Sequence, residues 1–273
     1  MTRPLVSIIT PTYERAWFLG EAARWIRAQS YPNYEWLILD DSREPCAALA
    51  GAADPRIRYR HVAQRMTIGA KRNELMADAR GEIIAHFDDD DYYAPDYLHT
   101  MVELLESRGA DFVKLSGYYL YDLRHDFFGY WALRNTTGLQ FGCYANVLRV
   151  HVVGREEAAG LTDNYLGYGF SYVYRRALRE SARFADANLR EEPAFIEAIR
   201  SKFRIVCMDD EAGLALHLLH AQSTSTCHPQ YRLPHFLLPR IFPGAGDFLG
   251  RARGASRGAH EMPVYLERPP AHQ

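Results

Sequence analysis

The chain has 273 residues, enough for one large domain and a short appendage, and its 48% hydrophobic and 24% charged residues are ordinary for a globular protein. Its net charge of -2 provides no general attraction to polyanions, so we expect no nucleic-acid partner. The four cysteines lie far apart without a C-x-x-C pair, which argues against a zinc site and against a disulfide framework.

The first 115 residues alternate strand and helix patterns. Short apolar runs that end at proline or polar residues predict strands at residues 5–10, 34–39, 57–62 and 82–87. Helical periodicity predicts helices at residues 14–29, 69–79 and 95–107. This alternation indicates βαβ units, and therefore an α/β fold with a Rossmann-like, mostly parallel central sheet flanked by helices.

The second half of the chain is less regular. We predict strands at residues 112–115, 118–122, 170–174 and 204–207, and a helix at residues 192–202. From Pro239 onward Pro, Gly, Arg and Ala dominate, so residues 239–273 are expected to form a C-terminal tail, flexible or loosely docked after Gly250.

The sequence also suggests where the protein resides. No stretch approaches the roughly 18 apolar residues of a membrane span, and the N-terminus runs directly into a strand without a signal peptide. We therefore expect a cytoplasmic protein. The apolar segment Phe236-Leu237-Leu238 and nearby arginines would support at most a weak peripheral contact with a membrane.

Polar segments follow three of the predicted strands, at residues 11–13, 40–42 and 88–91. Ligands of open α/β sheets bind beyond the carboxyl ends of the strands, so the three segments should converge on one crevice. The third segment contains four consecutive aspartates, whose charges repel one another. A solvated acidic turn is one explanation, and a divalent cation is the other. Carboxylate oxygens suit Mn²⁺ or Mg²⁺, and we favour the cation.

Four motifs, in order, resemble those of the family-2 glycosyltransferases of the GT-A fold over roughly residues 4–225. They are Pro11-Thr12-Tyr13-Glu14-Arg15, Asp40-Asp41-Ser42, Gly69-Ala70-Lys71-Arg72-Asn73 and the segment from Asp88 to Pro95. The first motif departs from the family pattern at Glu14, where Asn is usual. The resemblance implies that residues 1–115 bind a nucleotide sugar and that residues 116–238 form the acceptor-binding and catalytic-base half of the same GT-A domain.

The resemblance also assigns nucleotide-binding roles. Pro11, Thr12, Tyr13 and Arg15 would line the nucleotide pocket. Asp40 or Asp41 would accept a hydrogen bond from a base N–H, which favours a UDP-sugar, although an Asp pair also forms turns and helix caps. Further candidates are Arg65, Lys71 and Arg72, which would face the diphosphate or the base unless they are surface cations.

By the same alignment Asp90 would bind the metal directly. Asp88 would bind the metal through water or orient the ribose, and Asp89 would take either role because a run of four leaves the register open. His220, followed by Ser223-Thr224-Ser225, resembles a family ending that lacks its usual Asn here. His220 is thus a third metal candidate, with a packed or exposed histidine as the alternative.

An E-D-x-x-F segment of the family resembles Glu191-Glu192-Pro193-Ala194-Phe195, with Glu in place of Asp. Glu192 is the candidate catalytic base and Glu191 the second choice, although acidic residues before a proline also favour a helix start. The loop containing Tyr168, Gly169 and Phe170 resembles the one that shapes the sugar and acceptor site.

The predicted function is metal-dependent transfer of a sugar from a nucleotide diphosphate to an unidentified hydroxyl acceptor, with inversion, in polysaccharide, lipopolysaccharide or glycoconjugate biosynthesis. A sugar nucleotidyltransferase would need a glycine-rich loop where residues 11–15 have none. A non-catalytic binding module would tolerate loss of the acids at positions 90 and 192. A glycoside hydrolase would need no obligatory cation. The interpretation fails if the aspartates point into solvent, remote from Thr12 and Tyr13.

Overall fold

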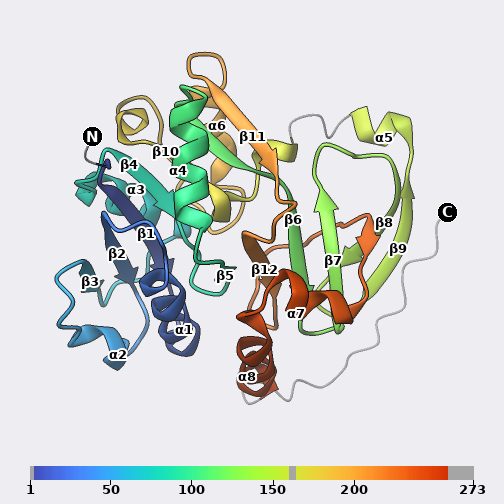
Figure 1. Ribbon diagram of the computed structural model, residues 1–273, viewed down its shortest axis with the longest axis horizontal. Helices are drawn as coiled ribbons and strands as arrows, with labels where there is room; N and C mark the ends of the chain where they lie inside the picture. Colours follow the sequence, from blue (N-terminus) through green and yellow to red (C-terminus); the bar gives the residue numbers. More distant parts are fainter. Residues whose placement is uncertain (1–2, 160–163, 258–273) are drawn as a thin grey trace.

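The computed structural model describes residues 3–159 and 164–257. Within them one eleven-stranded sheet has the order β13-β7-β6-β10-β4-β1-β2-β3. Off this path, β11 and β12 pair with β6, and β5 pairs with β12. A separate β8–β9 hairpin stands at the far end of the molecule from the N-terminal strands (Figure 1).

The N-terminal half has the expected βαβ organisation. Its strands are β1 (Val6–Thr12), β2 (Tyr34–Asp40), β3 (Ile57–His61) and β4 (Ile83–His86), and its helices are α1 (Ala16–Arg27), α2 (Ala47–Ala50), α3 (Ile68–Asp78) and α4 (Tyr97–Ser107). β3, β2, β1 and β4 are parallel neighbours. Because the carboxyl ends of parallel strands share one edge, the three polar segments approach one another there.

The C-terminal half is mixed rather than mostly parallel. Its strands are β5 (Tyr92–Tyr93), β6 (Phe112–Asp122), β7 (Phe127–Ala132), β8 (Gly138–Cys143), β9 (Leu148–Val153), β10 (Val173–Arg175), β11 (Ile205–Asp209), β12 (Ala215–Leu219) and β13 (Tyr231–Arg232). β10 runs antiparallel to β4 and β6, whereas β11 and β12 run parallel to β6. The parallel arrangement predicted for the sheet therefore describes its N-terminal half.

Helices lie between these strands and after the last of them. They are α5 (Arg155–Ala159), α6 (Glu192–Ile199), α7 (Leu238–Ile241) and α8 (Ala245–Arg257), with 3-10 turns η1 (Asn164–Leu166), η2 (Gly169–Ser171), η3 (Arg176–Glu180) and η4 (His235–Leu237). The strand predicted at residues 170–174 is therefore replaced by η2 and the later, shorter β10.

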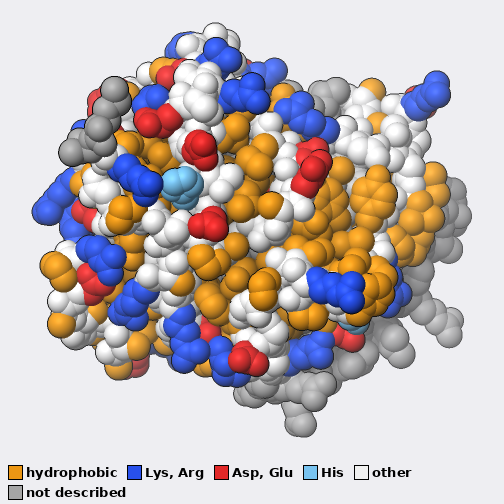
Figure 2. All heavy atoms as spheres, in the orientation of Figure 1, with side chains coloured by type: hydrophobic (Ala, Val, Ile, Leu, Met, Phe, Trp, Pro, Cys, Tyr) orange, Lys and Arg blue, Asp and Glu red, His pale blue; other side chains and the backbone are white. Residues whose placement is uncertain are grey.

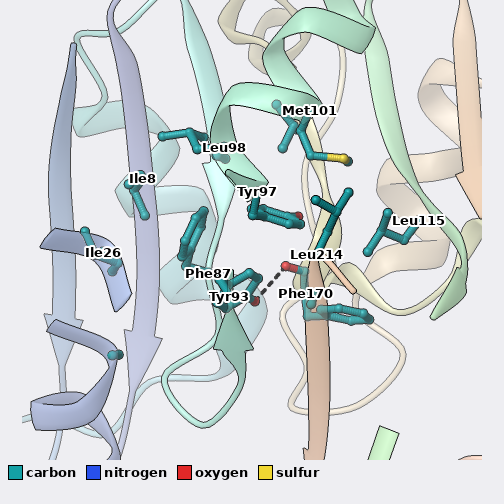
Figure 3. Close-up of a cluster of buried hydrophobic side chains, with 14 of the residues drawn as sticks. Ile8, Ile26, Phe87, Tyr93, Tyr97, Leu98, Met101, Leu115, Phe170 and Leu214 are labelled. Carbon is teal, nitrogen blue, oxygen red and sulfur yellow. Dashed lines mark hydrogen bonds between the residues drawn. The ribbon is translucent and has the colours of Figure 1, made fainter. Parts of the chain in front are cut away.

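Strand alternation divides the core between the two faces of the sheet. Ile8 of β1 packs with α1 and α4, and the adjacent Ile9 packs with α3 and α6. The first face is rich in aromatic rings, and the Tyr93 hydroxyl donates a hydrogen bond to the Phe170 carbonyl at 2.9 Å within it (Figure 3). Both faces of the sheet are thus covered, which fixes the strand ends that build the site.

Residues 238–257 form α7 and α8, so the helix continues past Gly250, where the composition predicted a tail that is flexible or loosely docked. α7 and α8 bury Phe242, Phe248, Leu249 and Ala252 in a third apolar cluster with Phe18 and Tyr92. The apolar positions of α8 recur at helical spacing, and this periodicity outweighs the glycines and arginines around them. The remainder of that predicted tail, residues 258–273, lies outside the described residues.

The surface is uneven in character. Hydrophobic side chains gather over the strands of the C-terminal half in the view of Figure 2, and charged side chains of both signs surround the N-terminal half. Across the described ranges, no helix combines the length and apolar character needed to cross a bilayer.

Gly69 lies where α3 meets the loop that leads to α6. A Cβ at this position would lie 1.8 Å from the Ala185 carbonyl oxygen. We expect Gly69→Ala to lower the free energy of unfolding by about 1–3 kcal/mol, because the loop must move away. Gly20→Ala, inside α1 with no atom near the added methyl group, should instead raise it by about 0.4–1 kcal/mol. Urea unfolding of both variants checks this, and equal stabilities would contradict it.

Candidate active site

A cleft of about 960 Å³ opens at the carboxyl ends of β1 and β4. Most of the predicted site residues line it: Pro11, Thr12, Tyr13, Arg15, Arg65, Lys71, Arg72, Asp88, Asp89, Asp90, Tyr168, Gly169, Phe170, Glu191 and Glu192. Asp40, Asp41 and His220 are buried next to the cleft but do not form its lining. Segments 11–13 and 88–91 therefore meet in the cleft as predicted, whereas segment 40–42 lies behind it, linked through the Lys71 amine to Asp41 and the Thr12 carbonyl.

At one end of the cleft, Tyr13 and Arg65 form an exposed stack. The Arg65 guanidinium carbon lies 3.3 Å from the centre of the Tyr13 ring, and the same side chain pairs with Asp41. Asp41 is fully buried and accepts two further hydrogen bonds at 2.7 Å, from Lys71 Nζ and from the Met66 backbone N–H. Burial lowers the pKa of Lys71, and Asp41 partly offsets this. This end of the cleft thus combines an aromatic ring, stacked on a guanidinium, with the buried ion pair of Asp41 and Lys71.

Asp40 plays the structural role that the sequence left open. Its carboxylate accepts hydrogen bonds from the Ser42 backbone N–H at 2.9 Å and from the Tyr59 hydroxyl at 2.6 Å. These contacts hold the turn after β2. Of the two aspartates, Asp41 is the one positioned toward the cleft residues.

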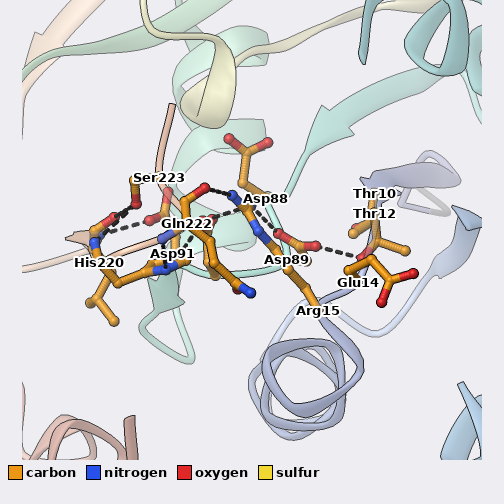
Figure 4. Close-up of polar contacts among 12 residues, drawn as sticks. Thr10, Thr12, Glu14, Arg15, Asp88, Asp89, Asp91, His220, Gln222 and Ser223 are labelled. Atoms are coloured by element: carbon orange, nitrogen blue, oxygen red, sulfur yellow. Dashed lines mark hydrogen bonds and ion pairs between the residues drawn. The ribbon is translucent and has the colours of Figure 1, made fainter. Parts of the chain in front are cut away.

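The aspartates after β4 lie against the turn that follows β1 (Figure 4). Asp89 accepts a hydrogen bond from the Thr12 hydroxyl at 2.5 Å. Arg15 Nη1 lies 2.9 Å from Asp89 Oδ1 and 2.7 Å from Asp90 Oδ2. Burial alone would raise the pKa of Asp90. Arg15 and His220 nevertheless hold this pKa below its usual range. The acids therefore face the predicted nucleotide turn and not open solvent.

His220 lies behind Asp90. Its Nε2 is 3.0 Å from Asp90 Oδ2, its Nδ1 accepts a hydrogen bond from the Gln222 backbone N–H at 3.2 Å, and its ring stacks on Phe18. Both ring nitrogens are thus engaged, and Nε2 carries the proton toward the carboxylate. In this arrangement His220 orients Asp90 and offers no free nitrogen to a metal.

Asp91 is bound by two residues of β12, His217 and Leu218. Both of its oxygens lie 2.9 Å from His217 Nδ1, and Oδ1 also accepts the Leu218 backbone N–H at 2.8 Å. Burial raises the pKa of Asp91 to about 6, despite the opposing charge of His217. Asp91 therefore anchors β12 beneath the acid cluster.

The donor set fits a hard divalent cation. Asp88, Asp90 and Asp91 each present one oxygen within 4.8 Å of the others. Burial, followed by the neighbouring carboxylates Asp90 and Asp89, raises the pKa of Asp88 to about 6 despite the opposing effect of Arg72. The negative charge at Asp88 is therefore incompletely offset by the protein, as a cation site requires. Asp88, 27% exposed, is the most accessible of these acids.

Arg72 links the acid cluster to the predicted base. Its Nη2 lies 3.3 Å from Asp88 Oδ1, and its Nη1 lies 2.5 Å from Glu191 Oε1 and 3.7 Å from Glu192 Oε1. Glu191 is buried, which raises its pKa, while Arg72 opposes that rise. Glu192 is more exposed and accepts the Gly169 backbone N–H at 3.1 Å. Glu192 is thus the freer of the two carboxylates to meet an acceptor.

Lys114 holds the loop before η2 through two hydrogen bonds. Its amine donates hydrogen bonds to the Tyr165 carbonyl at 2.7 Å and to the Gly167 carbonyl. The next residue, Tyr168, adopts a left-handed conformation with φ of 63°, and its ring packs on Trp131. Strain of this kind concentrates at functional sites. The strained loop that borders Glu192 is therefore a structural part of the cleft.

Burial lowers the pKa of Lys114 to about 7, whereas an unfolded lysine titrates near about 10.4. Between these values the unfolded chain binds more protons, so the free energy of unfolding should rise with pH, by up to about 1.4 kcal/mol per unit. Lys114→Met should flatten this rise. Denaturant unfolding from pH 7.5 to 9.5 tests the prediction, and parallel profiles for the two proteins would contradict it.

Sequence reasoning missed part of the cleft. Residues 222–226 line it, although the sequence marked Ser223-Thr224-Ser225 only as part of a motif without a role in the site. His217 lines the cleft beside Asp91. The only sequence signal for His217 is its position three residues before His220, on a strand that was not predicted. Leu189 and Arg190 line the other end, and Arg190 adopts a positive φ of 61° that no sequence pattern announces.

Comparison with known proteins agrees with this architecture. Residues 7–151 match the family described as glycosyl transferase family 2, and this segment is slightly more than half of the chain. The fold is that of a GT-A protein. The chain belongs to glycosyl transferase family 2.

Curated relatives match the N-terminal part. A putative teichuronic acid biosynthesis glycosyltransferase, TuaG of Bacillus subtilis, is 28% identical over 127 residues, covering 43% of this chain and 48% of TuaG. A putative colanic acid biosynthesis glycosyl transferase, WcaA of Escherichia coli, is 35% identical over 99 residues, covering 35% of this chain and 36% of WcaA. The matches thus span less than half the length of these relatives.

Solved structures share the fold. S. aureus TarS 1-349 in complex with UDP-GlcNAc has a TM-score of 0.56 at 17% identity, covering 80% of this chain and 59% of TarS 1-349. The mannosyltransferase PcManGT from Pyrobaculum calidifontis, in complex with GDP-Man and Mn²⁺, has a TM-score of 0.55 at 18% identity, covering 82% and 59%. At these identities the likeness establishes the fold.

Proposed function

We propose that this protein is a metal-dependent glycosyltransferase that moves a sugar from a nucleotide diphosphate, preferably UDP, to a hydroxyl acceptor with inversion. The observation that carries the proposal is the position of the aspartates. They lie between the Thr12–Tyr13 turn, which Asp89 contacts directly, and Glu192, which Arg72 links to Asp88. One cleft therefore joins a nucleotide site, a cation site and a base.

Asp90 and Asp88 would hold Mn²⁺ or Mg²⁺, with Asp90 oriented by His220. When bound, the cation would neutralise the charge that develops on the departing diphosphate. Tyr13 would stack on the base, and Asp41 would accept its N–H. That bond requires Arg65 to give up its pairing with Asp41.

Glu192 would take the proton of the acceptor hydroxyl. The hydroxyl oxygen would attack the anomeric carbon while the bond between that carbon and the diphosphate breaks. The Gly169 N–H, 3.1 Å away, would keep this carboxylate pointed into the cleft. A single displacement of this kind inverts the anomeric configuration. Glu191, locked by Arg72 at 2.5 Å, would position Arg72 and leave the proton transfer to Glu192.

The names of the relatives suggest the biological setting. TuaG and WcaA are described as acting in the biosynthesis of teichuronic and colanic acids, so a role in cell-surface polysaccharide or glycoconjugate synthesis is the setting we propose. Screening nucleotide sugars for Mn²⁺-dependent thermal stabilisation tests the function. Stabilisation by a nucleotide sugar only with metal supports it, and no stabilisation by any nucleotide sugar would contradict it.

The proposed base site makes a separate prediction. Tyr13→Ala should weaken UDP binding by about 5–30-fold, because stacking on an aromatic ring contributes about 1–2 kcal/mol. Tyr13→Phe keeps the ring and should bind UDP within about twofold of the wild type. Calorimetric titration with UDP in saturating Mn²⁺ measures both variants. Wild-type affinity in a folded Tyr13→Ala protein would place the base elsewhere.

A further inference from the structure

The guanidinium of Arg15 stands inside the acid cluster. It lies 2.9 Å from an oxygen of Asp89 and 2.7 Å from an oxygen of Asp90, and its Nη2 donates a hydrogen bond to the Gln222 carbonyl at 2.9 Å. In Figure 4 the side chain reaches from the start of α1 to the aspartates. Only 20% of the Arg15 side chain is exposed. A protein cation thus already pairs with Asp90, a carboxylate that we assign to the metal site.

The preceding backbone directs Arg15 into this position. Glu14 has a φ of 53°, a left-handed conformation that is unfavourable for a non-glycine residue. The turn is held from outside, because the Glu14 backbone N–H donates to Ser42 Oγ at 2.6 Å and its carboxylate pairs with Arg43. Such a strained and braced turn indicates that the direction of the Arg15 side chain matters.

Arg15 and a divalent cation would compete for the negative charge of Asp90. The same oxygen of Asp90, Oδ2, faces both Arg15 and His220. A metal ion beside this carboxylate would repel the guanidinium at short range. A diphosphate offers the guanidinium replacement oxygens in the planar, paired geometry that arginine prefers, and Arg15 lines the same cleft.

We propose that Arg15 is an exchangeable cation. It neutralises Asp90 before the metal arrives, yields this carboxylate to the metal, and then pairs with the diphosphate of the donor. This inference rests on the proposed function, in which a cation at Asp90 holds the diphosphate. It makes metal and nucleotide binding mutually dependent, because each relieves the cost that Arg15 imposes on the other.

The alternative is a permanent clamp, in which Arg15 keeps the aspartates together in every state. The two roles predict opposite changes in metal affinity. Loss of a clamp should weaken metal binding, because the carboxylates would spread apart. Loss of an exchangeable cation should strengthen metal binding, because a competitor is removed.

Direct binding of Mn²⁺, followed by electron paramagnetic resonance without nucleotide, distinguishes these roles. We expect Arg15→Gln to bind Mn²⁺ about tenfold more tightly than the wild type, and to bind UDP about tenfold more weakly in saturating Mn²⁺. Arg24→Gln is the matched control, since Arg24 also pairs with an acid, Glu21 of α1, but is 61% exposed and does not line the cleft. It should match the wild type in both measurements. Arg15→Met, which removes the charge but keeps a long side chain, serves if Arg15→Gln does not fold.

Two failures can be told apart. Unchanged or weaker Mn²⁺ binding by a folded Arg15 variant, with Mn²⁺ bound normally by the wild type, would overturn the exchange and leave the proposed function standing. Absence of Mn²⁺ binding by the wild type and all variants would contradict the metal dependence itself, and with it this inference.

Discussion

Asp90→Ala is expected to lower metal-stimulated turnover of the donor by about 10²–10³-fold, the usual cost of losing a group that stabilises developing charge. The reason lies in the contacts of Asp90. Asp90 provides one of the oxygens that can hold a cation together with Asp88. Its carboxylate also contacts Arg15 and His220. Removing it eliminates a ligand and leaves Arg15 and His220 without the carboxylate that they contact. Release of nucleotide from the best donor of a screened panel, with Mn²⁺ present, measures the effect.

Asp78→Ala is the matched control for this substitution. Asp78 ends α3 outside the cleft, is 47% exposed, and faces Arg60 at 3.5 Å. Its loss should change turnover by less than about twofold, since an exposed ion pair contributes little. A folded Asp90→Ala protein with full Mn²⁺-stimulated turnover would remove Asp90 from the metal site.

Glu192→Gln should lower kcat by about 10²–10⁴-fold, the usual contribution of a general base, and leave UDP affinity nearly unchanged. The substitution keeps the shape of the side chain and the acceptor for the Gly169 N–H, but it removes the ability to take a proton. Steady-state kinetics and UDP titration separate the two effects. Glu103→Gln, at an α4 side chain that is 71% exposed, is the control that should behave as the wild type.

The neighbouring carboxylate gives a contrasting outcome. Glu191→Gln removes the partner that lies 2.5 Å from buried Arg72, so its main effect should be on folding stability. Should Glu191→Gln instead remain stable and lose catalysis, while Glu192→Gln stays active, the assignment of the base would be reversed.

The sequence predicted the N-terminal half well because its signals are local. Strands β1 and β2 are short, largely apolar runs that end at Thr12 and at Asp40, and buried parallel strands have this pattern. β6 was instead predicted as two strands separated near Gly117. The glycine is needed inside the strand, because a Cβ there would lie 2.4 Å from the Tyr130 hydroxyl. Packing against β7, and not a turn, explains this glycine.

The residue types of the site could be predicted, but their pairing could not. Four aspartates in sequence leave their roles open, and only the structure shows that Asp91 is saturated by β12 while Asp88 keeps 27% of its side chain exposed. His217 was missed because β12 carries no alternating pattern and is buried on both sides. Ser223-Thr224-Ser225 were noted as a motif, but no sequence pattern places them in the lining of the cleft. Contacts between segments more than a hundred residues apart depend on the topology, which a local pattern does not contain.

The central claim is that the aspartate cluster binds a cation and that this cation binds the diphosphate. Calorimetric titration of UDP into the wild type and Asp90→Ala, each with Mn²⁺ and after chelation, tests it most directly. We predict that chelation weakens UDP binding to the wild type by at least about tenfold and leaves binding to Asp90→Ala unchanged. Equal UDP affinity of the wild type with and without metal would contradict the account.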